Sequence, residues 1–186
     1  MDMSLSADDY TVIESRVLLD HPLVRVVADT LEHGARRAPY FYLESPVDSV
    51  ATVALTAERQ IILTRQYRHP IRAVIYDLPA GRLKSGEDPA DGARRELEEE
   101  TGYHAGSLTP LGRYNPFPGS LKVTAHLFLA HDLTYVGQQL DTGEDLEIAL
   151  LPFEEVLHMV LRGEYLDGSL QLGVLLAAAT RKGLIA

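Results

Sequence analysis

The chain has 186 residues, of which 46% are apolar and 24% are charged, proportions that are ordinary for a globular protein. This length predicts one domain, or one domain with a small extension. The formal net charge of −10 argues against a nucleic-acid backbone or an anionic membrane as the main partner. The absence of cysteine excludes disulfides and thiolate metal sites and fits a cytoplasmic protein. No basic segment followed by an apolar one begins the chain, and no apolar run approaches about 18 residues, so we expect neither a secretory signal nor a membrane span.

The first 46 residues predict a small antiparallel β-meander. Residues 10–17, 23–30 and 39–43 are rich in β-branched and aromatic residues and are separated by polar turns, a pattern typical of strands. We therefore divide the chain into an N-terminal extension over residues 1–46 and a main domain over residues 47–186. Tyr40 in the third strand either packs as an ordinary strand residue or stacks on a substrate base.

The main domain alternates strands with helices. A hairpin is expected at 49–55 and 60–67, and a short strand at 74–77 runs into the loop Leu78–Gly81. After an acidic helix, the pattern predicts strands at 107–114, 122–130 and 146–151 and helices at 153–161 and about 169–182. This order indicates an α+β protein whose mixed sheet lies between helices.

The acidic helix has clear start and stop signals. Asp88 is a good N-cap, and Pro89 suits the first helical position. Gly102 suits the position that closes a helix in the left-handed conformation. Five acids lie between these ends: Asp91, Glu96, Glu98, Glu99 and Glu100.

Three of these acids share one face of the helix. At about 100° per residue, Glu100 falls about 40° from Glu96 and Glu99 about 60° on the other side. Packed anions repel one another, so a cation should offset them, and hard divalent cations prefer oxygen ligands. Arg95 can also reach Glu99 at i+4. The simpler interpretation is a solvated acidic helix face.

The same stretch has the spacing G-x5-E-x7-R-E-U-x-E-E-x-G-U, where U is a bulky apolar residue, from Gly81 to Tyr103. In this pattern it resembles the Nudix box. The resemblance implies the Nudix fold, an α/β/α sandwich with a mixed sheet, here preceded by the N-terminal meander. It also implies hydrolysis of a nucleoside diphosphate that is linked to another moiety.

The cluster favours hard metals. Carboxylates with no thiols and no closely spaced histidine pair favour Mg²⁺ or Mn²⁺ over zinc. Two or more such ions could clamp a diphosphate and acidify an attacking water. The resemblance implies metal ligands at Glu96, Glu99, Glu100 and the carbonyl of Ala80, an orienting role for Arg95, and structural roles for Gly81, Glu87 and Gly102.

The flanking motifs narrow the substrate class. Gln66-Tyr67-Arg68 followed by Leu78-Pro79-Ala80-Gly81 resembles the ADP-ribose and ADP-sugar pyrophosphatase branch of the family, as does Pro118, 16 residues after Gly102. In that branch an N-terminal extension builds a homodimer and contributes to the adenosine site. The simpler interpretation of Arg65, Arg68 and Arg82 is that each forms a surface ion pair. The expected substrate contacts are Arg68 first, then Arg65, Arg82, Pro118, Gly119 and Tyr40.

A general base is still needed. In this branch it is a glutamate on a late loop, and the candidates here are Glu144 and Glu147. Glu144 follows Gly143 and precedes the strand, so we favour it and place Glu147 second. The simpler interpretation is that both are solvated loop acids.

The sequence therefore predicts metal-dependent hydrolysis of ADP-ribose, or a related ADP-sugar, to AMP and ribose 5-phosphate, by water attack at phosphorus. The expected partner is a small nucleoside diphosphate sugar. The runner-up is an NADH pyrophosphatase, because Asn115–Leu121 resembles part of that group's signature. A third hypothesis is a non-catalytic module that senses ADP-ribose.

Overall fold

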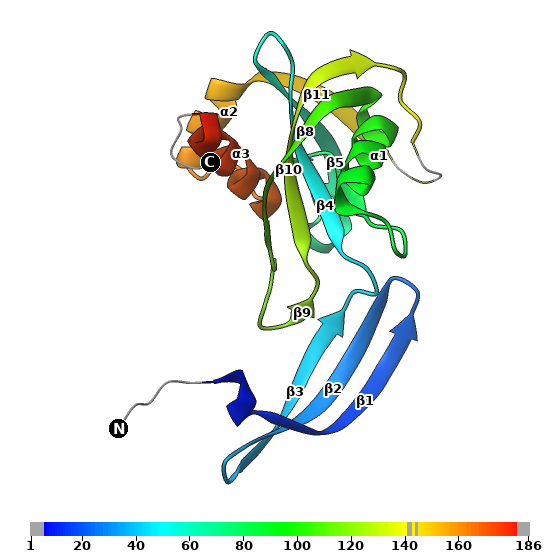
Figure 1. Cartoon of the computed structure of the whole chain (residues 1–186), viewed down its shortest axis with the longest axis vertical. Helices are drawn as coiled ribbons and strands as arrows, with labels where there is room; N and C mark the ends of the chain where they lie inside the picture. The colour runs from blue at the N-terminus through cyan, green and yellow to red at the C-terminus, as the bar shows by residue number, and fades with distance from the viewer. Residues whose placement is uncertain (1–5, 141–142, 144, 182–186) are drawn as a thin grey trace. The chain divides into compact units, whose positions relative to one another are not determined.

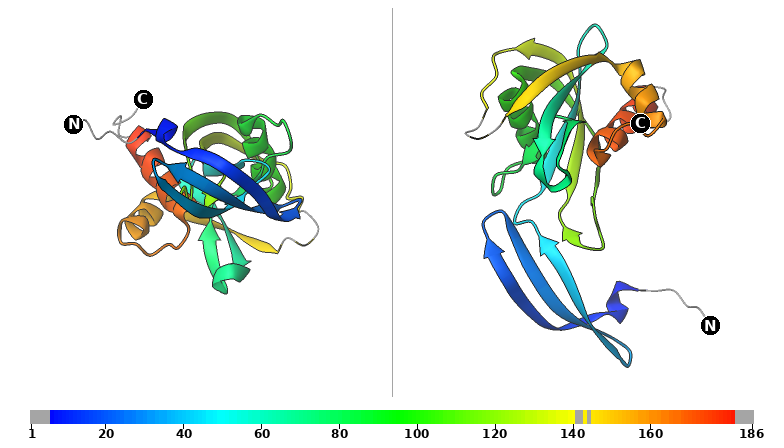
Figure 2. Two further views of the ribbon diagram at one scale, coloured as in Figure 1. Left: turned by 90° about the horizontal axis from the view of Figure 1, so that it is seen from below. Right: turned by 180° about the vertical axis from the view of Figure 1, so that it is seen from behind.

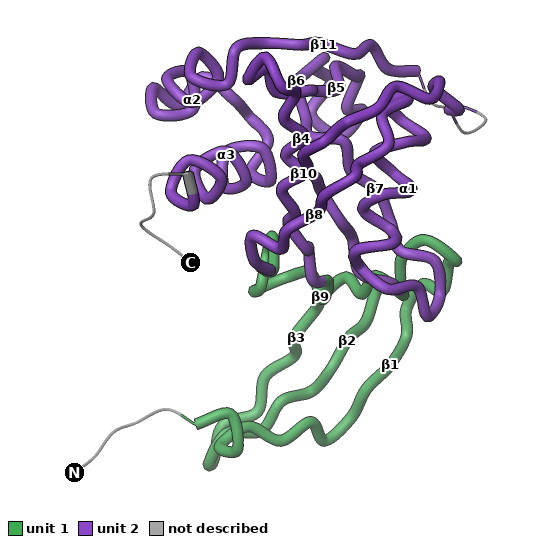
Figure 3. Tube along the Cα trace, turned by 45° about the horizontal axis from the view of Figure 1, so that its top comes forward, with its two compact units in different colours: residues 1–46, 115–123 green, residues 47–114, 124–186 purple. Residues whose placement is uncertain are grey.

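The computed structural model describes residues 6–140, 143 and 145–181. The chain forms two compact units (Figure 3): unit 1 comprises residues 1–46 and 115–123, and unit 2 comprises residues 47–114 and 124–186. The nine residues 115–123 therefore belong with the N-terminal strands, although they lie far from them in the sequence.

Unit 1 is a four-stranded sheet in the order β1-β2-β3-β9. Strands β1 (Thr11–His21), β2 (Val24–His33) and β3 (Arg36–Glu44) form an antiparallel meander, which confirms the sequence prediction. The fourth strand, β9 (Leu121–Lys122), pairs with β3 in parallel. A short 3₁₀ helix, Ala7–Asp9, precedes β1.

Unit 2 contains a seven-stranded mixed sheet whose main path runs β11-β5-β4-β10-β8. All its pairs are antiparallel except β10 with β4. Strand β6 pairs with β5, and β7 pairs with β4. A 3₁₀ turn, His69–Ile71, joins β5 to β6. The strands are β4 (Ser49–Leu55), β5 (Gln60–Arg68), β6 (Ala73–Asp77), β7 (Ala80–Arg82), β8 (Tyr103–Tyr114), β10 (Ala125–Tyr135) and β11 (Leu146–Pro152).

Helices cover both faces of this sheet (Figures 1 and 2), so unit 2 is an α/β/α sandwich as the sequence predicts. Helix α1 (Pro89–Thr101) packs on one face, and α2 (Phe153–Leu161) and α3 (Gly168–Arg181) pack on the other. The predicted signals of α1 are confirmed: Asp88 accepts from the backbone of Ala90, and Gly102 has a φ of 75°. Before α3, the side chain of Asp167 accepts from the backbone N–H of Leu170 over 2.6 Å.

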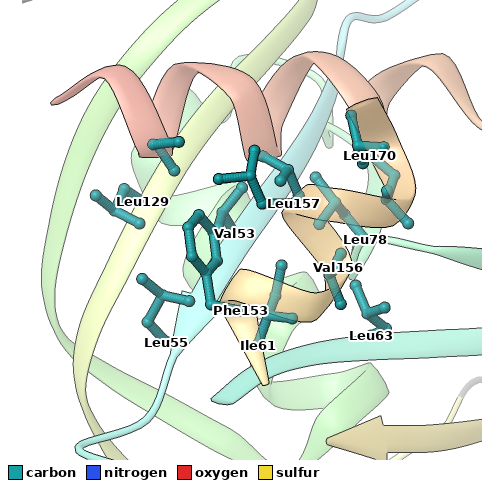
Figure 4. Close-up of a cluster of buried hydrophobic side chains, with 14 of the residues drawn as sticks. Val53, Leu55, Ile61, Leu63, Leu78, Leu129, Phe153, Val156, Leu157 and Leu170 are labelled. Atoms are coloured by element: carbon teal, nitrogen blue, oxygen red, sulfur yellow. The ribbon is translucent and has the colours of Figure 1, made fainter. Parts of the chain in front are cut away.

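Two hydrophobic layers hold the sandwich together. On the α2/α3 side, Phe153 and its neighbours fill the space between those helices and the sheet (Figure 4). On the α1 side, the fully buried Leu97 packs with Ala54 and Ile62. Strand β4 contributes to both layers because successive side chains point to opposite faces, which explains its continuous apolar sequence.

Several boundaries in unit 2 differ from the sequence prediction. Ala80–Arg82 is strand β7 and not loop, because it pairs with the start of β4. The strand expected at 122–130 begins at Ala125 and runs to Tyr135, since Leu121–Lys122 bonds to β3. Strand β8 begins at Tyr103, directly after α1. Among the described residues, no helix is long and apolar enough to cross a membrane.

Candidate active site

The acidic face of α1 lies against the short strand β7. A Cβ atom added to Gly81 would lie only 2.1 Å from the carboxyl carbon of Glu96, so this glycine is what lets the carboxylate approach the backbone. The backbone N–H of Ala80 donates to Glu100 over 2.9 Å. Glu100 is 4% exposed, and this bond satisfies a carboxylate that burial would otherwise penalise.

Arg95 binds several acceptors at once. Its guanidinium donates to both carboxylate oxygens of Glu87 at 2.9 Å, to Glu96 at 2.7 Å and to Glu99 at 2.8 Å. It also donates to the carbonyl of Arg82 on β7 over 3.1 Å. This planar fork with several N–H donors is what distinguishes arginine from lysine. Arg95 therefore ties the loop before α1, the helix and β7 to one point.

Glu87 is the partner most affected by this network. Arg95 lowers the pKa of Glu87 to about 2, helped by the backbone N–H of Lys84, which donates over 2.8 Å. The pKa of Arg95 is raised, chiefly by its bond to Glu87. Both side chains are largely buried, with exposed fractions of 15% and 18%. Glu87 is therefore ionised at neutral pH and braces the loop between β7 and α1.

The donor set around α1 fits a hard divalent cation by its chemistry. Glu96, Glu99 and Glu100 supply only oxygen, and Arg95 cannot neutralise them together with Glu87, so the local charge is negative. Oxygen ligands with excess negative charge suit Mg²⁺ or Mn²⁺. In the part of the chain that the structure describes, no three acidic or imidazole side chains already converge in ligand geometry. Glu96 and Glu99 accept from Arg95 instead.

The expected substrate-binding arginines of β5 each contact a carboxylate. The guanidinium of Arg68 forms an ion pair with Asp77 at the end of β6. Burial is the main reason why the pKa of Asp77 is raised, and Arg68 works against that shift. Arg65 pairs with Glu147 over 2.7 Å on the neighbouring strand β11. Arg82 lies on β7, where its carbonyl accepts from Arg95.

Of the two candidates for the general base, the structure describes only Glu147. Glu144 lies outside the described residues. Glu147 is 73% exposed and faces Arg65 across the β5–β11 pair. Its neighbour Ile148 packs toward the layer that contains Leu97 of α1. Because adjacent strand residues point to opposite faces, Glu147 points away from the face that α1 covers.

The three remaining expected contacts, Tyr40, Pro118 and Gly119, gather in unit 1. Tyr40, Pro118 and Gly119 line one cavity of about 420 Å³. The Tyr40 hydroxyl donates to the carbonyl of Gly119 over 2.6 Å, which holds the proline-containing loop against β3. Burial raises the pKa of Tyr42, and the nearby carboxylates of Asp29 and Glu44 add to that shift. The cavity also includes Asp29, Tyr42, Asn115 and Ser120–Lys122.

Sequence reasoning missed Asp77 and Asp29. The sequence does contain a signal for Asp77, because this charged residue ends the otherwise apolar β6 and precedes Leu78–Gly81. Asp29 lies within a strand and gives no such signal. Each has one buried carboxylate oxygen, Oδ1, that lacks a hydrogen-bond partner among the described residues.

Comparison with known proteins places the chain in a family. A model of the NUDIX domain matches residues 46–167, which is more than half of the chain. The protein belongs to the NUDIX family. The matched range contains every described residue of α1 and β7, and members of the family generally use divalent metal ions.

Curated relatives and a solved structure agree with this NUDIX assignment. The chain is 39% identical over 121 residues to an ADP-ribose pyrophosphatase of Bacillus subtilis (strain 168), a match that covers 64% of this chain and 65% of that protein. It therefore spans just under two thirds of that relative. It is 33% identical over 138 residues to an ADP-ribose pyrophosphatase of Mycobacterium tuberculosis, covering 73% of this chain and 67% of the relative.

A crystal structure of an ADP compounds hydrolase superposes on this NUDIX protein with a TM-score of 0.86. The match covers 97% of this chain and 98% of the other, at 22% sequence identity. At that identity the likeness shows the shared fold, which includes the N-terminal meander.

The Glu87–Arg95 pair predicts an acid-sensitive contribution to stability. Because the folded-state pKa of Glu87 is lowered from 4.5 to about 2, the contribution is complete above pH 4.5 and is lost as the pH falls toward 2. It amounts to on the order of 2 kcal/mol after allowance for solvent screening. Urea unfolding of the metal-free wild type and Glu87→Gln, measured at several pH values, should show a difference that shrinks below pH 4.5. A difference that stays constant down to pH 3 would contradict this account.

Proposed function

We propose that this protein hydrolyses the diphosphate of ADP-ribose, or of a related ADP-sugar, to AMP and ribose 5-phosphate. Water adds across the phosphoanhydride, so one oxygen enters at phosphorus and the two products leave as phosphate monoesters. The observation that carries the proposal is the oxygen-only carboxylate group of α1, held against β7 by Gly81 and by the Ala80 N–H. The names of the two relatives support the choice of ADP-ribose.

The metal-binding residues in this proposal are Glu96, Glu99, Glu100 and the carbonyl of Ala80. Two or more Mg²⁺ or Mn²⁺ ions held there would neutralise the diphosphate and acidify water. Arg95 keeps the carboxylates of Glu96 and Glu99 within reach of each other while it stays bound to Glu87. Gly81 leaves room for the carboxylate of Glu96, and Gly102 takes the positive φ that ends α1.

Each unit contains residues that we propose as substrate contacts. In unit 2, Arg68 is held in place by Asp77 and is the first candidate for a phosphate contact, with Arg65 and Arg82 behind it. In unit 1, the cavity beside Tyr40, Pro118 and Gly119 is of a volume typical of small-molecule sites, and its tyrosines suit an aromatic base. We propose that this cavity binds an aromatic base.

An NADH pyrophosphatase is the second candidate. The segment Asn115–Leu121 supports it, because its sequence resembles part of that group's signature. Asn115 donates to the carbonyl of Val123 over 2.6 Å and closes this loop. A non-catalytic sensor of ADP-ribose is the third candidate. The intact set of carboxylates on α1 argues against that third reading.

A substrate panel separates these candidates. We expect saturable release of AMP and ribose 5-phosphate from ADP-ribose with Mg²⁺ or Mn²⁺, none with EDTA, and slower cleavage of NADH at equal concentration. Initial rates by chromatography of the nucleotide products provide the measurement. Faster NADH cleavage would transfer the assignment to the second candidate. If no nucleoside diphosphate is turned over with either metal, the sensor hypothesis is the one to pursue.

The base is assigned to Glu144 by its place in the sequence. Glu144→Gln should lower kcat by orders of magnitude while the dissociation constant for ADP-ribose stays near that of the wild type, because only proton removal is lost. Glu147→Gln is the matched comparison, since it removes the other candidate acid, whose partner is Arg65. A loss in Glu144→Gln below about tenfold, or about 1.4 kcal/mol, removes Glu144 from this role. A collapse in Glu147→Gln alone transfers the role to that residue.

We further propose that residues 1–46 form the contact of a homodimer. Strand β1 is exposed along its whole length, and Val12, Val17, Leu18 and Leu19 are each more than half exposed. Apolar surface of this kind is typical of an interface. Light scattering should give twice the chain mass of 20.5 kDa, and the pair of substitutions Val17→Asp and Leu19→Asp should reduce it to one chain. A wild-type protein that is monomeric at micromolar concentration contradicts the proposal.

A further inference from the structure

The C-terminal turn of α1 is bound to the segment Val136–Gln139. The last carbonyls of a helix have no partner within it and must find one elsewhere. Here the backbone N–H of Gln139 donates to the carbonyl of Glu99 over 3.0 Å, and the N–H of Val136 donates to that of Gly102 over 2.7 Å. The side-chain amide of Gln138 donates to the carbonyl of Glu100 over 2.6 Å. The segment thus caps the turn that carries two of the three acidic ligands.

The segment Val136–Gln139 also packs closely against the end of α1. A Cβ atom on Gly102 would lie 2.7 Å from the backbone nitrogen of Gln138 and 2.8 Å from the carbonyl carbon of Gly137. Tyr103 and Tyr135 pack edge to face, with 5.3 Å between ring centroids. Gly102 is therefore needed for two reasons, its positive φ and the approach of this segment.

Glu100 is held at both of its ends. Its carboxylate accepts from the Ala80 N–H on β7, and its carbonyl accepts from Gln138. The residue itself is buried, so both bonds act on a group with little access to water. A side chain fixed at its tip and at its backbone has few ways to rotate.

We propose that Gln138 is a positioning residue for the metal ligands Glu99 and Glu100. Its amide fixes the last turn of α1 relative to the segment that follows β10, so that the carboxylates keep the spacing that a divalent ion requires. The inference rests on the proposed metal site. Groups that orient ligands from outside the ligand set commonly tune metal affinity in this way.

The neighbouring glutamine offers a matched control. Gln139 bonds to α1 through its backbone N–H, and among the described residues no hydrogen bond joins its side chain to α1. Replacing the Gln139 side chain should leave that bond in place. Gln138→Met keeps the length and neutrality of the side chain but removes the donor, and Gln139→Met makes the same chemical change one residue along.

The experiment measures Mn²⁺ affinity of the full-length, metal-free protein by electron paramagnetic resonance of free Mn²⁺, together with thermal unfolding. We expect Gln138→Met to raise the Kd for Mn²⁺ about three- to tenfold, at or below the lower end of outer-sphere effects, with Gln139→Met within about twofold of wild type. The number of ions bound should not change.

Three results would overturn the inference. A lowered melting temperature of Gln138→Met with an unchanged Kd would show a helix cap with no role in metal binding. Equal weakening in both variants would show a general disturbance of the segment. Failure of the wild type to bind Mn²⁺ would remove the metal site itself, which is a failure of the proposed function and is seen before any variant is made. If Gln138→Met does not fold, Gln138→Asn, which is too short to reach the carbonyl, replaces it.

Discussion

The site depends on one guanidinium group that is surrounded by carboxylates. Arg95 binds Glu87, Glu96 and Glu99 together, and it also reaches the carbonyl of Arg82. Without Arg95, the carboxylates of Glu96 and Glu99 on the helix and of Glu87 on the preceding loop would repel one another. With it, the helix, the loop and β7 are joined at a single largely buried point. A lysine could supply the charge but not the several directed donors that this arrangement uses.

Helix α1 is anchored at both ends, and the anchors differ in kind. At its start, Asp88 caps the backbone and Glu87 fixes the preceding loop to Arg95. At its end, the segment Val136–Gln139 donates hydrogen bonds to the last carbonyls. Between these ends, Leu97 and Ala93 bury the adjoining side of the helix against the sheet. The acidic face is thus left where the backbone of Ala80 and Gly81 meets it.

Short-range signals in the sequence predicted the ends of α1 and the strands of the meander. The N-cap, the proline and the closing glycine of α1 each act within a few residues, and the strands of the meander follow from composition and turns. What escaped prediction involves partners that only strand pairing or helix packing brings together. Arg68 meets Asp77 only because β5 and β6 pair, and Leu121–Lys122 leaves its expected strand because β3 offers it a partner. The capping role of Gln138 likewise appears only when β10 brings it to the end of a helix 38 residues earlier.

The central claim is that one face of α1, and not its acidity as a whole, binds divalent metal. Two neighbouring glutamates test this directly. Glu99 lies on the proposed ligand face, whereas Glu98 points about 200° away from Glu96 around the helix and contacts His104 at 2.9 Å. The decisive measurement is the Kd for Mn²⁺ of Glu99→Gln and Glu98→Gln beside the wild type. We predict a loss of about tenfold or more for Glu99→Gln and wild-type affinity for Glu98→Gln. Equal affinities in the two variants would contradict the account.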